Sequence, residues 1–479
     1  MEPESLGNKA VKGAVWAAID RFGSMALQFF VNLVLARLLT PSDFGTIGML
    51  YIFIAVSITL SEGGFASALI QKRESTQVDY STIFFWNLGT SVALYGIIYV
   101  LAPFIADFYD LYELSRILRF FGLSIVFSSI VSVQIAKLQK DLSFKHLAIV
   151  NILSYIIGSG IAIIMAFNGY GVWSLVALNL VYIAFKILLF YFLTKWLPDL
   201  VFSYSSLKKL FNFGGYLLCA NLLQTACQNV QGLIIGKRFS AAQLGYYSQA
   251  EKLNSVVSES IPRIIVQVMY PVYSKIQDDR QRLVSTVLMN IRIISFFIFP
   301  LIGCLILVSQ PMIEFLYGEK WLISVPYFRI LCVGGIFTSL TNINYYAVAA
   351  VGESRSLFFW SFYKWGVLLL LLIGSSFISM TAMVWGVVLS NFNIFMVNVL
   401  LSRKFVGISL RGVCHSIMPI AMLSIGILFF LFHIDSLFNH LPWPLLIIVY
   451  LISFLGFSYL FHFKSLNESL NLLRKIRAN

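Results

Sequence analysis

The chain has 479 residues, of which 59% are hydrophobic and only 11% are charged. A soluble protein typically has about a quarter of its residues charged, so this composition excludes an ordinary soluble domain and indicates an integral membrane protein. The formal net charge of +13 raises the possibility of a nucleic-acid partner, which the placement of the cations then decides.

The predicted elements are all helices. A membrane-spanning helix needs about 20 mostly apolar residues, and the polar interruptions leave about fourteen stretches of that length. We predict an all-α integral membrane protein with helices at residues 14–38, 44–70, 82–105, 115–136, 146–167, 172–194, 212–236, 244–271, 283–308, 323–350, 356–378, 381–402, 412–433 and 442–463.

The loop charges predict the orientation. With the N-terminus inside, 21 Lys and Arg residues fall in inner loops and tails and four in outer loops, which are Arg37, Lys237, Arg238 and Lys320. Cytoplasmic loops carry the excess of Lys and Arg, so we expect both termini in the cytoplasm. Because topology and anionic membrane lipids account for the cations, we expect membrane lipids as partners and no nucleic acid.

One phrase occurs twice at a constant offset. "LARLLTPSDFG" at residues 35–45 is echoed by "IGKRFSAAQLG" at 235–245, and "YGVWSLV" in the sixth span is echoed by "AMVWGVV" in the twelfth. Units of six spans must cross the membrane in the same orientation, as in two-lobed transporters. We therefore predict two pseudo-symmetric six-helix lobes, a further helix pair and a basic cytoplasmic tail, at residues 1–202, 203–405, 406–463 and 464–479.

Polar stripes run along the first and seventh predicted helices. A spacing of three and four residues places Arg21, Ser24, Gln28 and Asn32 on one face of the first helix. The same spacing places Asn221, Gln224 and Gln228 on one face of the seventh helix. Such residues can simply form hydrogen bonds between helices. Two stripes at symmetric positions instead favour a central cavity.

Ionisable residues inside the spans are a sharper signal, because each costs about 2.5 kcal/mol or more at the membrane centre. Asp20, Lys186, Arg292 and Lys364 lie in such positions, and the eighth helix carries a stripe of Lys252, Ser255, Glu259 and Arg263. Glu259 and Arg263 can also satisfy each other as an i,i+4 pair. The excess of cations suits a substrate that bears phosphate, which Arg binds through bidentate hydrogen bonds.

These observations give one set of candidate residues. No catalytic constellation or metal-ligand spacing is present, and the five cysteines are interpreted as packing residues. We predict a substrate cavity that includes Asp20, Arg21, Gln28, Asn221, Gln224, Gln228, Lys252, Glu259 and Arg263.

Seven phrases in order resemble one family. "LARLLTPSDFG", "FASALIQKRE", "KLQKDLSFKHLA", "YGVWSLV", "LGYYSQAEKL", "YPVYSKIQDD" and "LYGEKW" are similar to motifs of bacterial polysaccharide transporters, the Wzx-type flippases of the MOP superfamily, especially the colanic acid exporter branch. The resemblance covers residues 9 to about 410.

The resemblance implies alternating-access transport of an undecaprenyl-pyrophosphate-linked oligosaccharide across the bacterial inner membrane, for surface polysaccharide synthesis. It implies a cavity lined mainly by the first, second, seventh and eighth helices, no cofactor, and polysaccharide polymerase machinery as a further partner. The coupling ion, H⁺ or Na⁺, stays open, because many relatives carry an aspartate where this chain has Gln231.

Other functions are compatible with part of these sequence features. A small-solute exporter or a peptidoglycan-precursor flippase of the same superfamily would share the architecture. A membrane polysaccharide polymerase or ligase is the enzyme alternative, and it is disfavoured because such enzymes have a large periplasmic loop, whereas the longest outer connection here has about ten residues. No motif specifies the sugar.

Overall fold

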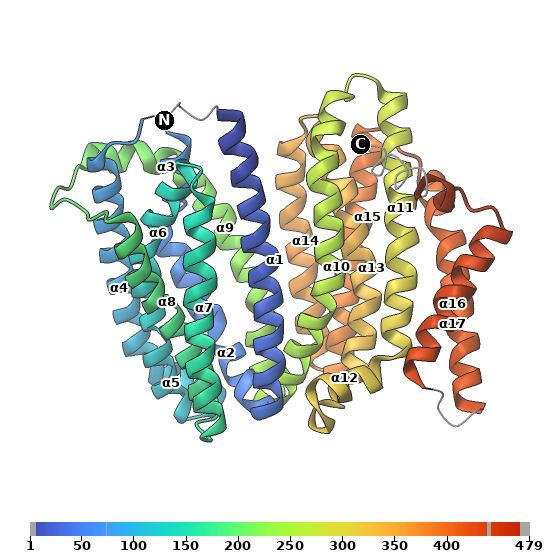
Figure 1. The fold of residues 1–479 in the computed structure, drawn as a ribbon, viewed down its shortest axis with the longest axis horizontal. Coiled ribbons are helices and arrows are strands. Elements are labelled where there is room, and N and C mark those ends of the chain that lie inside the picture. The colour runs from blue at the N-terminus through green and yellow to red at the C-terminus, as the bar shows by residue number, and fades with distance from the viewer. Residues whose placement is uncertain (1–5, 73, 438–441, 470–479) are drawn as a thin grey trace. The chain divides into compact units, whose positions relative to one another are not determined.

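The computed structural model describes residues 6–72, 74–437 and 442–469. Within these ranges, only the backbone is described for residues 6–11, 212–213, 216–217, 259–261, 263–268 and 435–437. The described backbone forms helices and connecting turns and contains no β-strand, which confirms the predicted all-α fold (Figure 1).

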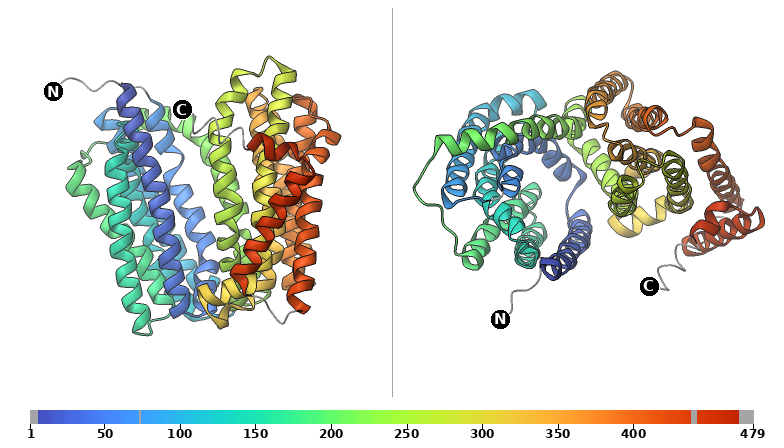
Figure 2. Two further views of the ribbon diagram at one scale, coloured as in Figure 1. Left: turned by 45° about the vertical axis from the view of Figure 1, so that its right-hand side comes forward. Right: turned by 90° about the horizontal axis from the view of Figure 1, so that it is seen from above.

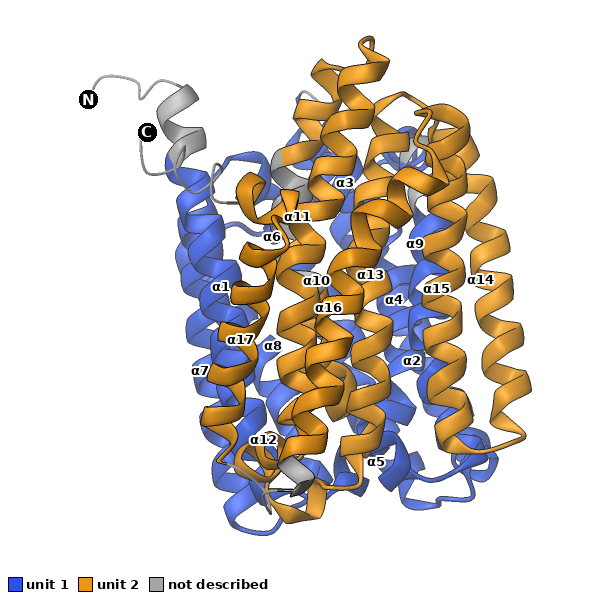
Figure 3. Ribbon diagram, turned by 90° about the vertical axis from the view of Figure 1, so that its right-hand side faces the viewer, with its two compact units in different colours: residues 1–245 blue, residues 246–479 orange. Residues whose placement is uncertain are grey.

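The chain divides into two compact units, residues 1–245 and 246–479 (Figure 3). In each unit most long helices run side by side (Figure 2). The helices of unit 1 are α1 Leu6–Leu38, α2 Pro41–Glu62, α3 Phe65–Gln71, α4 Gln77–Tyr109, α5 Glu113–Phe121, α6 Leu123–Lys140, α7 Phe144–Phe167, α8 Val172–Thr194 and α9 Tyr204–Arg238. Helix α10 spans Ala241–Lys275, and its first five residues belong to unit 1.

Unit 2 contains the rest of α10 and the helices that follow. These are α11 Arg280–Leu307, α12 Ser309–Tyr317, the short 3₁₀ helix η1 Glu319–Trp321, α13 Ser324–Ala350, α14 Ser354–Ser376, α15 Met380–Phe405, α16 Leu410–Leu437 and α17 Trp443–Leu460. The two compact units are defined by contacts within the fold, whereas the predicted lobes, residues 1–202 and 203–405, are defined by the sequence repeat. The units therefore do not test the lobes, which stay a prediction.

Each of the fourteen predicted spans falls on a helix or on a pair of consecutive helices. Among the described residues, twelve segments are long and apolar enough to cross a membrane. The two others are α9 and α10, which have 35 residues each and are the least apolar of the long helices. In α9 the predicted polar stripe lowers the hydropathy.

Local signals set the ends of α2. Thr40 and Asp43 form a reciprocal capping box at its start, where Thr40 Oγ1 accepts a hydrogen bond from the Asp43 backbone amide, and Pro41 occupies the first turn. The helix ends at Gly63 and Gly64, whose φ angles of 58° and 70° are left-handed and favour glycine. The predicted span 44–70 is therefore two helices, α2 and α3, separated by this turn.

The first residues of α9 and the segment before it are held by the start of α4. The buried carboxylate of Asp79 accepts hydrogen bonds from Lys72 Nζ at 2.5 Å and from the Ser206 hydroxyl of α9. Three side chains of α4 bind the connecting segment. Gln77 accepts a hydrogen bond from Trp196 Nε1 at 2.7 Å and donates one to the Leu197 carbonyl at 2.8 Å. The hydroxyls of Ser81 and Thr82 accept hydrogen bonds from the backbone amides of Asp199 and Ser203 at 2.9 and 3.1 Å. The connection from α8 to α9 is thus fixed along its length.

The two C-terminal helices pack on α11. Buried side chains from α11, α16 and α17 form one apolar cluster. Within it the Ser424 hydroxyl lies 2.5 Å from the Tyr450 hydroxyl and donates to the Phe299 carbonyl at 3.1 Å. These polar groups therefore satisfy one another between the three helices.

The repeated phrase forms a reciprocal backbone contact inside unit 1. A Cβ added to Gly45 of α2 would stand 1.6 Å from the carbonyl oxygen of Ala241. A Cβ added to Gly245 of α10 would stand 1.9 Å from the carbonyl oxygen of Pro41. The two glycines are 200 residues apart, as are the two residues they contact, so each copy of the phrase packs on the other.

Gly45 offers a test of this contact. Gly45→Ala forces a methyl group against a backbone carbonyl. We therefore expect the free energy of unfolding to fall by about 1–3 kcal/mol or more, and the purified protein in detergent to have a clearly lower melting temperature. Gly96→Ala in α4 is the matched control, because a Cβ there meets no atom within 4 Å. Equal melting temperatures of the two variants would contradict the close approach.

Candidate substrate pocket

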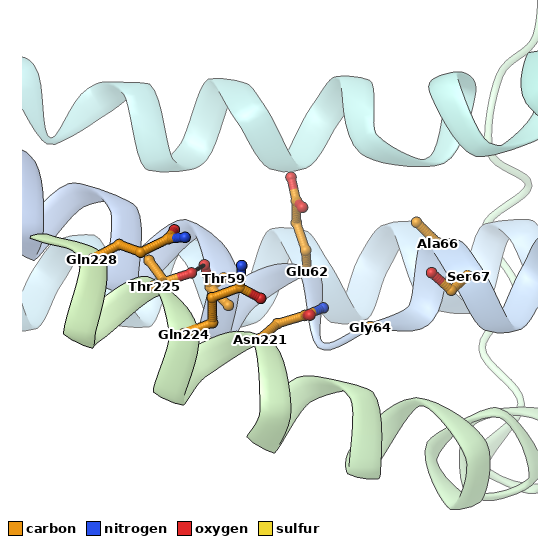
Figure 4. Close-up of a pocket in the computed structure, with 9 residues that line it drawn as sticks. All are labelled: Thr59, Glu62, Gly64, Ala66, Ser67, Asn221, Gln224, Thr225 and Gln228. Atoms are coloured by element: carbon orange, nitrogen blue, oxygen red, sulfur yellow. Dashed lines mark hydrogen bonds between the residues drawn. The ribbon is translucent and has the colours of Figure 1, made fainter. Parts of the chain in front are cut away.

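A polar pocket of about 320 Å³ lies inside unit 1 (Figure 4). It is formed by the second half of α2, the turn and helix α3 that follow, and the middle of α9. Its lining comprises Thr59, Glu62, Gly64, Ala66, Ser67, Asn221, Gln224, Thr225 and Gln228. Three of these residues, Asn221, Gln224 and Gln228, were predicted from the sequence as cavity residues.

The predicted stripe of α9 faces the end of α2. Figure 4 shows the amide groups of Asn221, Gln224 and Gln228 on the α2 side of α9. Thr59 and Thr225 join the two helices through their hydroxyls, 3.3 Å apart. Among the described residues we find no hydrogen-bond partner for the three amides, so their donors and acceptors are open to the pocket.

Glu62 is the one carboxylate among the described lining residues, and it was not among the residues predicted from the sequence. It is the last residue of α2 and precedes the turn at Gly63 and Gly64. Its side chain points away from α9 (Figure 4). The charge of Lys186 on α8 acts on it, and no hydrogen bond to its carboxylate occurs within the described part of the chain. An acid directly before two glycines was the available signal, but the predicted span 44–70 ran through the turn.

The predicted residues of α1 do not line this pocket. The Asp20 carboxylate accepts hydrogen bonds from the Ser24 hydroxyl at 3.2 Å and from Asn151 Nδ2 of α7 at 2.9 Å. Arg21 and Gln28 are exposed. Within the described ranges the Arg21 guanidinium forms no hydrogen bond or ion pair, so it is available to a ligand.

The predicted residues of α10 are only partly described. Lys252 is exposed on the unit 2 part of α10. The side chains of Glu259 and Arg263 lie outside the described side chains, although both residues belong to the helix. Their role in a cavity, and their pairing with each other, stay predictions.

Two other intramembrane cations have structural partners in unit 2. Arg292 of α11 binds Glu468 in a bidentate pair, with N–O distances of 2.9 and 2.5 Å. Lys364 of α14 is 6% exposed and donates to Asn398 Oδ1 of α15 at 2.5 Å. Arg292 is thus paired with a carboxylate and Lys364 with an amide oxygen, and neither residue lines the pocket described above.

The chain is similar in sequence to two bacterial biosynthesis proteins. The teichuronic acid biosynthesis protein TuaB of Bacillus subtilis (strain 168) is 27% identical over 368 residues, 76% of each chain. The lipopolysaccharide biosynthesis protein WzxC of Escherichia coli (strain K12) is 27% identical over 340 residues, 71% of this chain and 69% of the relative.

Solved structures share the fold. The lipid II flippase MurJ in an inward closed conformation has a TM-score of 0.73 at 16% identity, with 94% of this chain and 99% of that chain covered. An inward-facing multidrug resistance MATE transporter of the MOP superfamily has a TM-score of 0.61 at 16% identity, with 81% and 98% covered. The profile of the polysaccharide biosynthesis protein family matches residues 34–326, more than half of the chain. The chain therefore belongs to the polysaccharide biosynthesis protein family and has the fold of the MOP-superfamily transporters.

Proposed function

We propose that the chain moves undecaprenyl-pyrophosphate-linked oligosaccharide repeat units from the cytoplasmic to the periplasmic leaflet of the bacterial inner membrane, by alternating access. The polar pocket inside a helical membrane fold is the observation that carries this proposal, because apolar helices need no such lining unless a polar group enters it. The succinoglycan biosynthesis transport protein ExoT of Rhizobium meliloti (strain 1021), 22% identical over 75% of this chain, is a relative named for transport.

Transport is favoured over the enzyme alternative. The relatives and fold neighbours are named as biosynthesis, transport and flippase proteins, and none of those cited above is named as a polymerase or ligase. In this proposal no cofactor takes part, and the coupling ion, H⁺ or Na⁺, is not assigned. A polysaccharide polymerase would receive the product in the periplasm.

Arg21 is our candidate for binding the pyrophosphate. Its guanidinium is exposed on a predicted membrane helix and has no partner among the described residues. A planar guanidinium binds phosphate oxygens through two parallel, charge-assisted hydrogen bonds. A ligand of this kind would offset the cost of placing a cation there.

The orientation can be tested by cysteine labelling. The five native cysteines, of which Cys219 and Cys414 are exposed, are first replaced by serine. Single cysteines are then placed at the exposed residues Glu74 and Tyr112. With both termini in the cytoplasm, we expect an impermeant thiol reagent to label Tyr112→Cys in whole cells and Glu74→Cys only after the cells are opened. The reverse pattern would invert the proposed topology.

The role of Arg21 can be tested in a strain that lacks the native protein. We expect Arg21→Ala to lower polymer export about tenfold or more, because a charge-assisted hydrogen bond is lost. Arg21→Lys should restore only part of the export, since lysine keeps the charge but not the planar geometry. Both variants should leave lipid-linked repeat units on the cytoplasmic leaflet.

The control for this experiment is Arg355→Ala, which removes an exposed arginine at the start of α14, outside the proposed site. Membrane levels of all variants are measured by immunoblot. Normal export by Arg21→Ala at wild-type protein levels would remove Arg21 from the substrate site.

A further inference from the structure

The lining of the pocket does not suit a pyrophosphate. Among the described lining residues there is one carboxylate, Glu62, and no lysine or arginine. Phosphate oxygens carry negative charge and are bound in proteins mainly by Arg, Lys and backbone amide groups. The lining therefore offers no cation to a phosphate group, so the pocket fits another part of the substrate.

The pocket offers both donors and acceptors. Each of the three amides on α9, those of Asn221, Gln224 and Gln228, has two N–H donors and a carbonyl acceptor, and the carboxyl group of Glu62 supplies further acceptor oxygens. None of these groups is satisfied by another described residue. A complementary ligand must therefore both donate to Glu62 and exchange hydrogen bonds with the amides. Sugar hydroxyls do both, because each is a donor and an acceptor.

Size and polarity agree with this chemistry. The volume of about 320 Å³ is at the lower end of the range of about 300–1,000 Å³ for small-molecule sites. Most small-molecule pockets are predominantly apolar. Here only Gly64 and Ala66 among the lining residues lack a polar side chain, so the polyprenyl chain has no complementary surface.

Resting on the proposed function, we propose that this pocket in unit 1 binds a sugar residue of the lipid-linked oligosaccharide through its hydroxyl groups. Glu62 accepts hydrogen bonds from hydroxyls on one side of the sugar. Asn221 and Gln224 donate to and accept from hydroxyls on the α9 side. The pocket thereby distinguishes a carrier lipid that bears its glycan from the bare carrier.

The test measures binding to the full-length protein in detergent. Two probes are used: undecaprenyl pyrophosphate, and the undecaprenyl-pyrophosphate-linked repeat unit extracted from cells that lack the transporter. We expect the wild type to bind the glycan-bearing lipid more tightly. Glu62→Gln and Gln224→Ala should each weaken that binding about tenfold and leave the affinity for undecaprenyl pyrophosphate unchanged.

Glu74→Gln is the matched control, because it removes an exposed carboxylate outside the pocket, and it should bind both probes as the wild type does. Equal weakening of both probes by the pocket variants would assign the pocket to the carrier and overturn the sugar site. Unchanged binding of both would show that the pocket holds water only. A wild type that binds neither probe would refute the proposed transport function itself, whereas the other two outcomes refute only the sugar site.

Discussion

The contact on which unit 1 depends is the close approach of helix backbones at glycine. Gly45 and Gly245 let the starts of α2 and α10 touch through backbone atoms, where any side chain would clash. Small residues at helix contacts are the usual means of close packing in membranes, because no hydrophobic force drives apolar helices together there. The rest of α2 is then aligned along α9.

This alignment continues along the antiparallel pair α2 and α9. A Cβ added to Gly232 would stand 2.9 Å from the Gly48 carbonyl oxygen, so the helices touch at this level. Further along the pair, Thr59 and Thr225 meet through their hydroxyls, and the pocket opens beside them. Two contacts thus fix the position of the amide side chains of α9. One is the packing of Gly232 on Gly48, and the other is the hydrogen bond between Thr59 and Thr225 next to the pocket. A site built in this way is rigid along one side, since both contacts use short groups with few rotamers.

The sequence predicted the helices and part of the pocket, for different reasons. Hydropathy located every predicted span, because apolar length is a direct requirement of the bilayer. The stripe at Asn221, Gln224 and Gln228 was found because helical periodicity places those residues on one face. Glu62 was missed because the predicted span 44–70 ran through the turn at Gly63 and Gly64, and the two threonines were missed because nothing in their own helices marks them. Their role comes from the turn at Gly63 and from the partner helix, which are tertiary features.

The connection from α8 to α9 has a consequence for any division of the chain into two fragments. By the sequence repeat, α9 would open the second copy of a duplicated segment, yet Ser206 is bound to Asp79 and the preceding segment is bound along the start of α4. A chain cut at residue 203 would leave the buried Asp79 without its Ser206 donor and would place the two sides of the pocket on separate fragments. The two halves of the repeat, expressed as separate fragments, would therefore each lack part of this pocket.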